Sequence, residues 1–136
     1  MLLDTSVIIE ISSHSGNSDT VRDVLKFIPE DEILFVSILQ LSEIADWCMR
    51  NKFSVDEEMI MVKEFADVAY LDENICKEAA RIKMKRRSEG DSGFGLIDGI
   101  ILATARSIGQ RLLTLDRDFG GEDDCIILER NRGRDK

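Results

Sequence analysis

The chain begins with the stretch MLLDTSVII, residues 1–9, in which a carboxylate lies between two apolar runs. The three apolar residues before Asp4 predict a short buried strand, and the apolar residues after Asp4 allow that strand to continue. A carboxylate between two segments that favour burial needs a partner, a proton or a metal ion. Asp4 is therefore the first candidate functional residue, and the rest of the chain has to indicate which of these it has.

The composition is that of one folded domain. The chain has 136 residues, of which 43% are hydrophobic and 33% are charged, so it is long enough to bury a core. Its net charge of −9 argues against a surface that is basic throughout, although it leaves room for a local basic patch. The first residues lack a basic segment and reach Asp4 early, so we do not expect them to be a signal peptide, and no apolar run approaches the roughly 20 residues that cross a bilayer. We expect a cytoplasmic protein with no membrane partner.

The cysteines also favour a cytoplasmic protein. Cys48, Cys76 and Cys125 lie far apart, and none belongs to a CxxC pair or has a histidine nearby in the sequence. A zinc site is therefore not expected, and three sparse cysteines suit a reducing compartment.

Four further apolar stretches predict strands that alternate with helices. The strands are EILFVS (32–37), DVAYL (67–71), RLLTL (111–115) and CIILE (125–129), and the helices are expected over 21–28, 39–50, 57–66, 73–87 and 96–108. The expected capping residues are, in chain order, Asn17 or Ser18, Ser37 with Gln40, Ser54 with Glu57, and Asp72. Pro29 and Gly109 are placed to end the first and last of these helices.

This alternation predicts parallel βαβ units in a single α/β domain over residues 1–129. We expect a three-layer α/β/α sandwich around a mostly parallel sheet of four or five strands. Residues 130–136 form a basic C-terminal tail.

Acidic residues fall where parallel strands end and the following helices begin. Asp4 and Asp116 directly follow predicted strands, and Glu43 and Asp98 are expected in the first turns of helices. Ligands of open parallel sheets bind at the carboxyl ends of the strands, so the four acids are expected to meet in one cleft. A single acid is more often a solvated or helix-capping group. The joint placement is what favours a site.

Several carboxylates in a small volume repel one another and raise each other's pKa unless a cation is present. Oxygen ligands with few or no histidines favour Mg²⁺ or Mn²⁺ over zinc. One or two such ions activate water and stabilise the leaving oxygen of a phosphodiester. The acids therefore suit metal-dependent phosphodiester hydrolysis.

Four stretches resemble, in order, the motifs of PIN-domain nucleases. They are MLLDTSVII, SEIADW, GLIDGIILATA and LLTLDRDF, and the resemblance that they mark extends along nearly the whole chain. Among PIN proteins the chain looks most like the stand-alone VapC toxins of prokaryotic toxin–antitoxin pairs. The resemblance implies a Mg²⁺- or Mn²⁺-dependent endoribonuclease that acts on RNA, forms a homodimer and is inhibited by a cognate antitoxin whose tail enters the cleft.

The resemblance also implies roles for individual residues. Asp4, Glu43, Asp98 and Asp116 would bind the metal and carry catalysis. The supporting residues would be Thr5, Ser6 and Thr114, with Asp118 as a residue that shares or takes the role of Asp116. Asp46, one turn after Glu43, could face the same cleft.

The densest basic cluster of this acidic chain lies in one segment. It comprises Arg81, Lys83, Lys85, Arg86 and Arg87. Of these, Lys83, Lys85, Arg86 and Arg87 are candidates for contacts with an RNA backbone. The alternative is a solvated helix end whose cations offset the helix dipole.

Other function classes fit the sequence less well. A phosphatase of the haloacid dehalogenase type needs a second aspartate two residues after the first, where this chain has Ser6. A receiver domain needs paired acids and a late lysine that the chain does not place suitably. Two alternatives stay open: a PIN nuclease of RNA processing or quality control without an antitoxin, and a PIN-like binding module with an inactive site.

Overall fold

Five short parallel strands form the centre of the molecule, in a computed structural model that describes residues 1–12, 23–24 and 26–129. Their bounds are β1 Leu2–Leu3, β2 Phe35–Ser37, β3 Asp67–Ala69, β4 Leu112–Thr114 and β5 Cys125–Ile127. The strand order is β3-β2-β1-β4-β5, and every neighbouring pair is parallel. The predicted α/β fold with a parallel sheet is confirmed.

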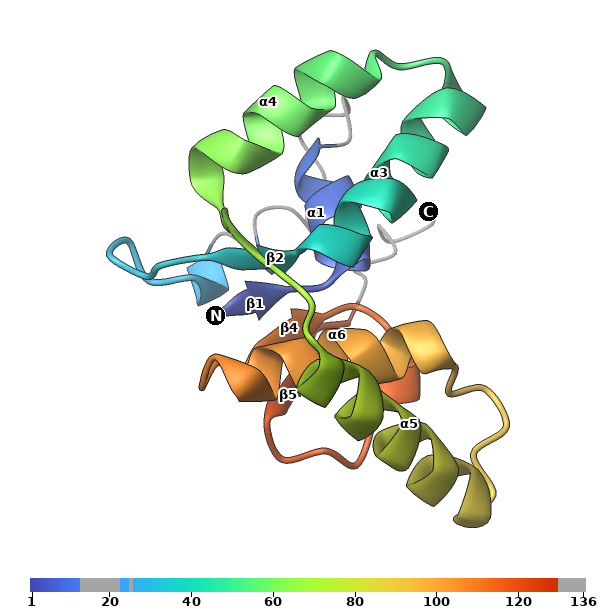
Figure 1. The fold of residues 1–136 in the computed structure, drawn as a ribbon. Helices are drawn as coiled ribbons and strands as arrows, with labels where there is room; N and C mark the ends of the chain where they lie inside the picture. The colour runs from blue at the N-terminus through green and yellow to red at the C-terminus, as the bar shows by residue number, and fades with distance from the viewer. Residues whose placement is uncertain (13–22, 25, 130–136) are drawn as a thin grey trace, which may run out of the picture.

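Helices cover both faces of this sheet (Figure 1). Their bounds are α1 Thr5–Ser12, α3 Ile38–Asn51, α4 Val55–Phe65, α5 Glu73–Ser88 and α6 Leu96–Ser107, with a 3₁₀ turn, η1, at Arg117–Phe119. The alternation of side chains along each strand supplies both layers. Leu3 and Leu113 join the apolar cluster under α1, α3 and α4, whereas Leu2 and Leu112 join the one under α5 and α6.

The capping residues that the sequence indicates begin three of the helices. Ser37 and Gln40 form a capping box at α3, in which the Ser37 N–H donates to Gln40 Oε1 at 2.8 Å. Ser54 accepts from the Glu57 N–H at the start of α4, and Asp72 accepts from the Ile75 N–H at the start of α5. These side chains satisfy amide groups that have no partner within the helix.

The helices α5 and α6 pack with very little space between them. A Cβ atom built on Gly99 would lie 2.6 Å from the backbone oxygen of Ala79. Only a residue without a side chain allows this approach, which brings α6 against α5 directly after Asp98.

The residues after Asp4 differ from the strand that the sequence allowed. They form α1 and do not continue the first strand. The apolar, β-branched residues of α1 suit a strand by composition, yet Val7 and Ile8 are buried on one side of a helix that packs on the sheet. Tertiary packing therefore overrides the local preference.

Parts of three expectations lie outside the described residues. These are most of the polar loop with Asn17 and Ser18, part of the helix expected over 21–28, and the tail 130–136. Residues 23, 24, 26 and 27 are helical. None of the helices among the described residues is long and apolar enough to span a membrane.

Candidate active site

Asp4 lies between β1 and α1 and is only 6% exposed. Its Oδ2 atom accepts hydrogen bonds from Ser6 Oγ at 2.7 Å and from Thr114 Oγ1 at 2.8 Å. Burial raises the pKa of Asp4, these hydroxyls lower it, and the nearby Asp116 raises it again. The side chain is thus fixed from the first turn of α1 and from the end of β4.

Glu43 is held through a relay of hydrogen bonds that begins at Gln40. The fully buried Gln40 donates from Nε2 to the Leu3 carbonyl at 2.7 Å and to Thr5 Oγ1 at 3.3 Å. Because Thr5 Oγ1 accepts from Gln40, its own proton points to Glu43 Oε1, which lies 2.8 Å away. Gln40 thus orients both Thr5 and Glu43. From the sequence, Gln40 is expected only to cap the helix that follows Ser37.

Asp98 is the third residue of α6, and its Oδ2 atom accepts from the Gly95 N–H at 2.9 Å. Asp116 follows β4 after one further residue, and its Oδ1 atom accepts from the Asp118 N–H at 2.9 Å. The Asp116 N–H in turn donates to Thr114 Oγ1, the hydroxyl that also contacts Asp4. Thr114 therefore ties Asp4 to the backbone of Asp116.

The electrostatics show that the acids of different elements lie near one another. Burial raises the pKa of Glu43, and repulsion by Asp4 and Asp98 raises it further. Burial likewise raises the pKa of Asp98, to which Asp116, Asp4 and Asp118 add. The structure therefore brings together Asp4, Glu43, Asp98 and Asp116 at the edge where β1, β2 and β4 end. Glu43 lies in the second turn of its helix, one turn later than expected.

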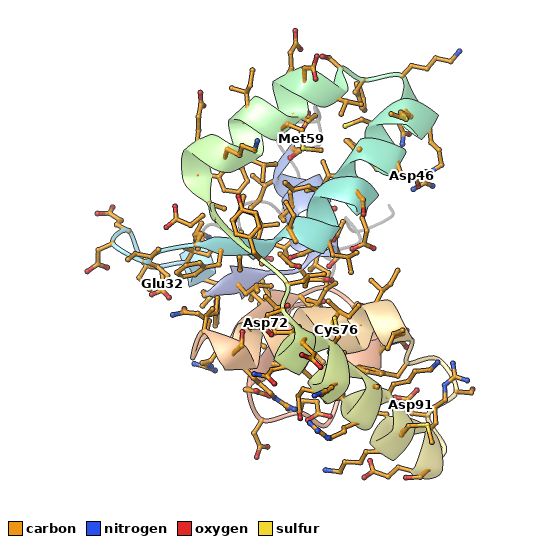
Figure 2. The ribbon with its side chains drawn as sticks, in the orientation of Figure 1. Glu32, Asp46, Met59, Asp72, Cys76 and Asp91 are labelled. Carbon is orange, nitrogen blue, oxygen red and sulfur yellow. The ribbon has the colours of Figure 1, made fainter. Side chains whose placement is uncertain are left out.

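Asp118 and Asp46 are two further acids that the sequence predicts near this site. Asp118 is exposed, and repulsion by Asp116 is the main reason that its pKa is raised, so it lies beside the four acids. Asp46 is exposed on the outer side of α3 and pairs with Arg50 at 3.0 Å (Figure 2). Because its side chain is 69% exposed, Asp46 is a surface residue.

The donor set fits a hard divalent cation. The groups at this edge are carboxylates and hydroxyls, and the raised pKa values mark negative charge that a cation would neutralise. Within residues 1–12, 23–24 and 26–129, no group of three or more acidic, histidine or cysteine side chains is placed so that it could hold a metal ion. Mg²⁺ retains several waters and needs only one or two carboxylates, so a site of separated acids suits it.

The basic cluster is divided by the structure. Lys85 and Arg87 are exposed and Lys83 is half-buried, whereas Arg86 is 8% exposed and is bound by groups of the chain itself. The expectation that Arg86 faces solvent with its neighbours is wrong. The sequence carried a signal for this, because Arg86 lies four residues after Ile82 and so continues the buried face of α5.

The molecule is therefore an α/β protein whose parallel sheet has helices on both faces and acidic side chains near the carboxyl ends of its strands. The chain belongs to the PIN-domain family, because the family model of the PIN domain matches residues 1–121. A comparison with curated proteins finds no significant match.

Solved structures share this fold over almost the whole chain. A chain of a toxin–antitoxin complex from Klebsiella pneumoniae matches with a TM-score of 0.74 at 18% identity, over 94% of this chain and 98% of that one. VapBC2 from Rickettsia felis, bound to a DNA fragment from its promoter, matches with a TM-score of 0.72 at 14% identity, over 94% and 96%. Mycobacterium tuberculosis VapC20, a toxin that cleaves the sarcin–ricin loop, matches with a TM-score of 0.61 at 16% identity, over 89% and 90%.

Proposed function

We propose that this PIN-domain protein is a Mg²⁺- or Mn²⁺-dependent endoribonuclease and the toxin of a VapBC-type toxin–antitoxin pair. The observation that carries the proposal is the meeting of Asp4, Glu43, Asp98 and Asp116 from four separate elements at one edge of the sheet. These four residues would hold one or two ions. When bound, such an ion activates water and neutralises charge on the phosphate that is cleaved.

The residues around the acids have supporting roles in this proposal. Ser6 and Thr114 hold Asp4 in one orientation, and Thr5 directs its proton to Glu43. A hydroxyl that donates to a carboxylate favours its charged form, which is the form that binds metal. Asp118 is the alternative fourth acid, beside Asp116.

RNA is the substrate we propose. The exposed or half-exposed cations Lys83, Lys85 and Arg87 lie at the end of α5, which leads through the loop 89–95 into the helix that carries Asp98. A short basic surface at this end would hold the phosphate backbone near the acids while the rest of the protein stays negative. The resemblance to VapC toxins and the structural likeness to VapC20 support RNA as the polymer.

The partners follow from the same likenesses. Structures from toxin–antitoxin complexes match nearly the full length of this chain. We propose that the protein acts in the cytoplasm as a homodimer and that a cognate antitoxin blocks the acidic cleft.

The test is cleavage of a structured RNA pool by the purified protein with Mn²⁺, with Mg²⁺ and with a chelator. The Asp98→Asn variant removes a site acid, and Asp46→Asn, which changes an exposed acid of α3, is the matched control. We expect metal-dependent cleavage by the wild type and by Asp46→Asn, and none by Asp98→Asn. Cleavage at the wild-type rate by Asp98→Asn would remove that residue from the site.

Two other results would replace the proposal with an alternative. Cleavage in vitro without growth arrest on expression would favour a nuclease of RNA processing or quality control. Absence of both cleavage and any Mn²⁺-dependent rise in Tm would favour a PIN-like binding module.

A further inference from the structure

Arg86 is a buried cation that connects α5 to two loops. Its guanidinium donates to Asp91 Oδ2 at 3.1 Å from Nε and at 2.6 Å from Nη2. It also donates to the backbone oxygens of Asp118 and of Gly120, the latter at 2.7 Å, and to Glu122 Oε1 at 3.3 Å. Its Cζ atom lies 4.8 Å from the centre of the Phe94 ring. One side chain thus binds residues from both the 89–95 and the 116–122 loops.

The 116–122 loop contains acids of the proposed active site, and the 89–95 loop leads directly into the helix that carries Asp98. The loop 89–95 runs from the end of α5, where Asp91 lies (Figure 2), to Gly95, whose N–H binds Asp98. The loop 116–122 contains Asp116 and Asp118. The loops also touch, since a Cβ atom on Gly93 would lie 3.3 Å from Asp118 Oδ1.

An arginine at this position is not what packing alone would select. The position continues the face of Ile75, Ala79 and Ile82, where an apolar side chain would bury without any charge to compensate. Replacing a buried ion pair with apolar residues is often neutral or stabilising. A buried guanidinium at this position therefore points to a geometric use, and its planar fork of donors suits two backbone carbonyls and a carboxylate oxygen that accepts from two nitrogens.

We propose that Arg86 is a positioning residue that holds the 116–122 loop against the start of α6 and so fixes Asp116 and Asp118 relative to Asp98. The inference rests on the proposed function, because it takes these acids as metal ligands. A direct contact of Arg86 with RNA would require an exposed guanidinium, whereas this one is 8% exposed and is surrounded by acceptors of the chain.

The experiment compares Arg86→Gln and Arg86→Lys with Arg81→Gln, which changes an exposed arginine of the same helix that pairs only at the surface with Glu78. Mn²⁺ affinity is measured by calorimetry on metal-free protein, and amide hydrogen exchange of residues 116–122 is followed without metal. Cleavage is then measured as separate kcat and KM values for RNA.

We expect Arg86→Gln to weaken Mn²⁺ binding by about 10-fold or more, as is typical when a residue that orients metal ligands is lost. Exchange in 116–122 should rise and kcat should fall, while the KM for RNA should stay near the wild-type value. Arg86→Lys keeps the charge but not the fork, so it should restore little. Arg81→Gln should match the wild type in all three measurements.

Val62→Ala is the control for a loss of Mn²⁺ affinity that is caused only by lower stability. It opens a cavity under α4, on the other face of the sheet. At a temperature where all variants are folded, Val62→Ala should keep wild-type Mn²⁺ affinity. If Arg86→Gln does not fold, Asp91→Asn removes the charged side-chain partner of Arg86 in the 89–95 loop and should weaken Mn²⁺ binding in the same direction.

Unchanged Mn²⁺ affinity and unchanged exchange in folded Arg86→Gln or Asp91→Asn would overturn the inference. A raised KM for RNA with normal metal affinity would also overturn it and return Arg86 to substrate binding. If the wild type binds no Mn²⁺, the proposed function fails, and hydrogen exchange in 116–122 still decides whether Arg86 holds this loop.

Discussion

The close packing of α5 and α6 predicts that Gly99→Ala destabilises the protein although alanine is the better helix former. The added Cβ would lie 2.6 Å from Ala79 O and 3.3 Å from Ala79 Cα, while ordinary contact begins at 3.4 Å. The helices would have to separate by about 0.8 Å, the difference between 3.4 and 2.6 Å. Both contacts are backbone atoms, so no side chain can rotate away to relieve them.

The magnitude follows from two opposing effects. Overpacking of this kind costs roughly 1–3 kcal/mol, and the change from glycine to alanine within a helix returns about 1 kcal/mol. Because the obstacle is backbone, we expect the upper part of the first range and a net loss of about 1–2 kcal/mol. For a domain of this size that lowers Tm by roughly 3–8 °C.

The assay is thermal unfolding of metal-free protein, followed by Mn²⁺ binding. Gly95→Ala is the control for the Tm measurement alone, because a Cβ there meets only Asp98 Oδ2 at an ordinary 3.6 Å. Gly99→Ala should also weaken Mn²⁺ binding, because the neighbouring residue is Asp98. A Tm equal to or above that of the wild type would refute the reasoning and show that the two helices separate at little cost.

Three further predictions concern the acids and their supports. Asp4→Asn should abolish cleavage while leaving the metal-free Tm unchanged or slightly higher, since burial and Asp116 disfavour the charged form of Asp4; a drop of several degrees would contradict this. The pKa values of Asp4, Glu43 and Asp98 are raised, mainly by burial, so the folded chain binds protons at these residues more tightly than the unfolded chain. Their contribution to the metal-free Tm should therefore fall as pH rises above the ordinary pKa values of 3.8 for aspartate and 4.5 for glutamate. The rise in Tm caused by Mn²⁺ should be larger at about pH 7.5 than at about pH 5, because protons compete with the metal. A Mn²⁺ effect that is the same at both pH values would argue against carboxylate ligands. Gln40→Leu should cost about 1–3 kcal/mol in urea unfolding and weaken Mn²⁺ binding, because the Leu3 carbonyl and Thr5 lose a buried partner; wild-type values in both assays would show that the relay to Glu43 is dispensable.

Local sequence was enough to predict where most helices begin and that the first strand is buried. The capping box of Ser37 and Gln40 and the N-cap Asp72 act through bonds to residues two or three positions away, so local sequence contains all that they need. The same holds for the alternation of Leu2 and Leu3, which sends neighbouring side chains to opposite faces of the sheet. The four acids were expected to lie close together because strand ends and helix starts can be read locally and a parallel sheet aligns them at one edge.

The helical conformation after Asp4 and the burial of Arg86 depend on contacts between segments that are distant in the sequence. The residues Thr5–Ser12 suit a strand by composition, but the edges of β1 are occupied by β2 and β4, and α1 buries its apolar side against the sheet. Arg86 belongs to a basic run that resembles a solvated helix end, and its acceptors on Asp118, Gly120 and Glu122 lie more than thirty residues further along the chain. Contacts between such distant segments exist only once the chain is folded, so the sequence placed Arg86 among the candidate RNA-binding cations, whereas in the folded chain it is buried between two loops.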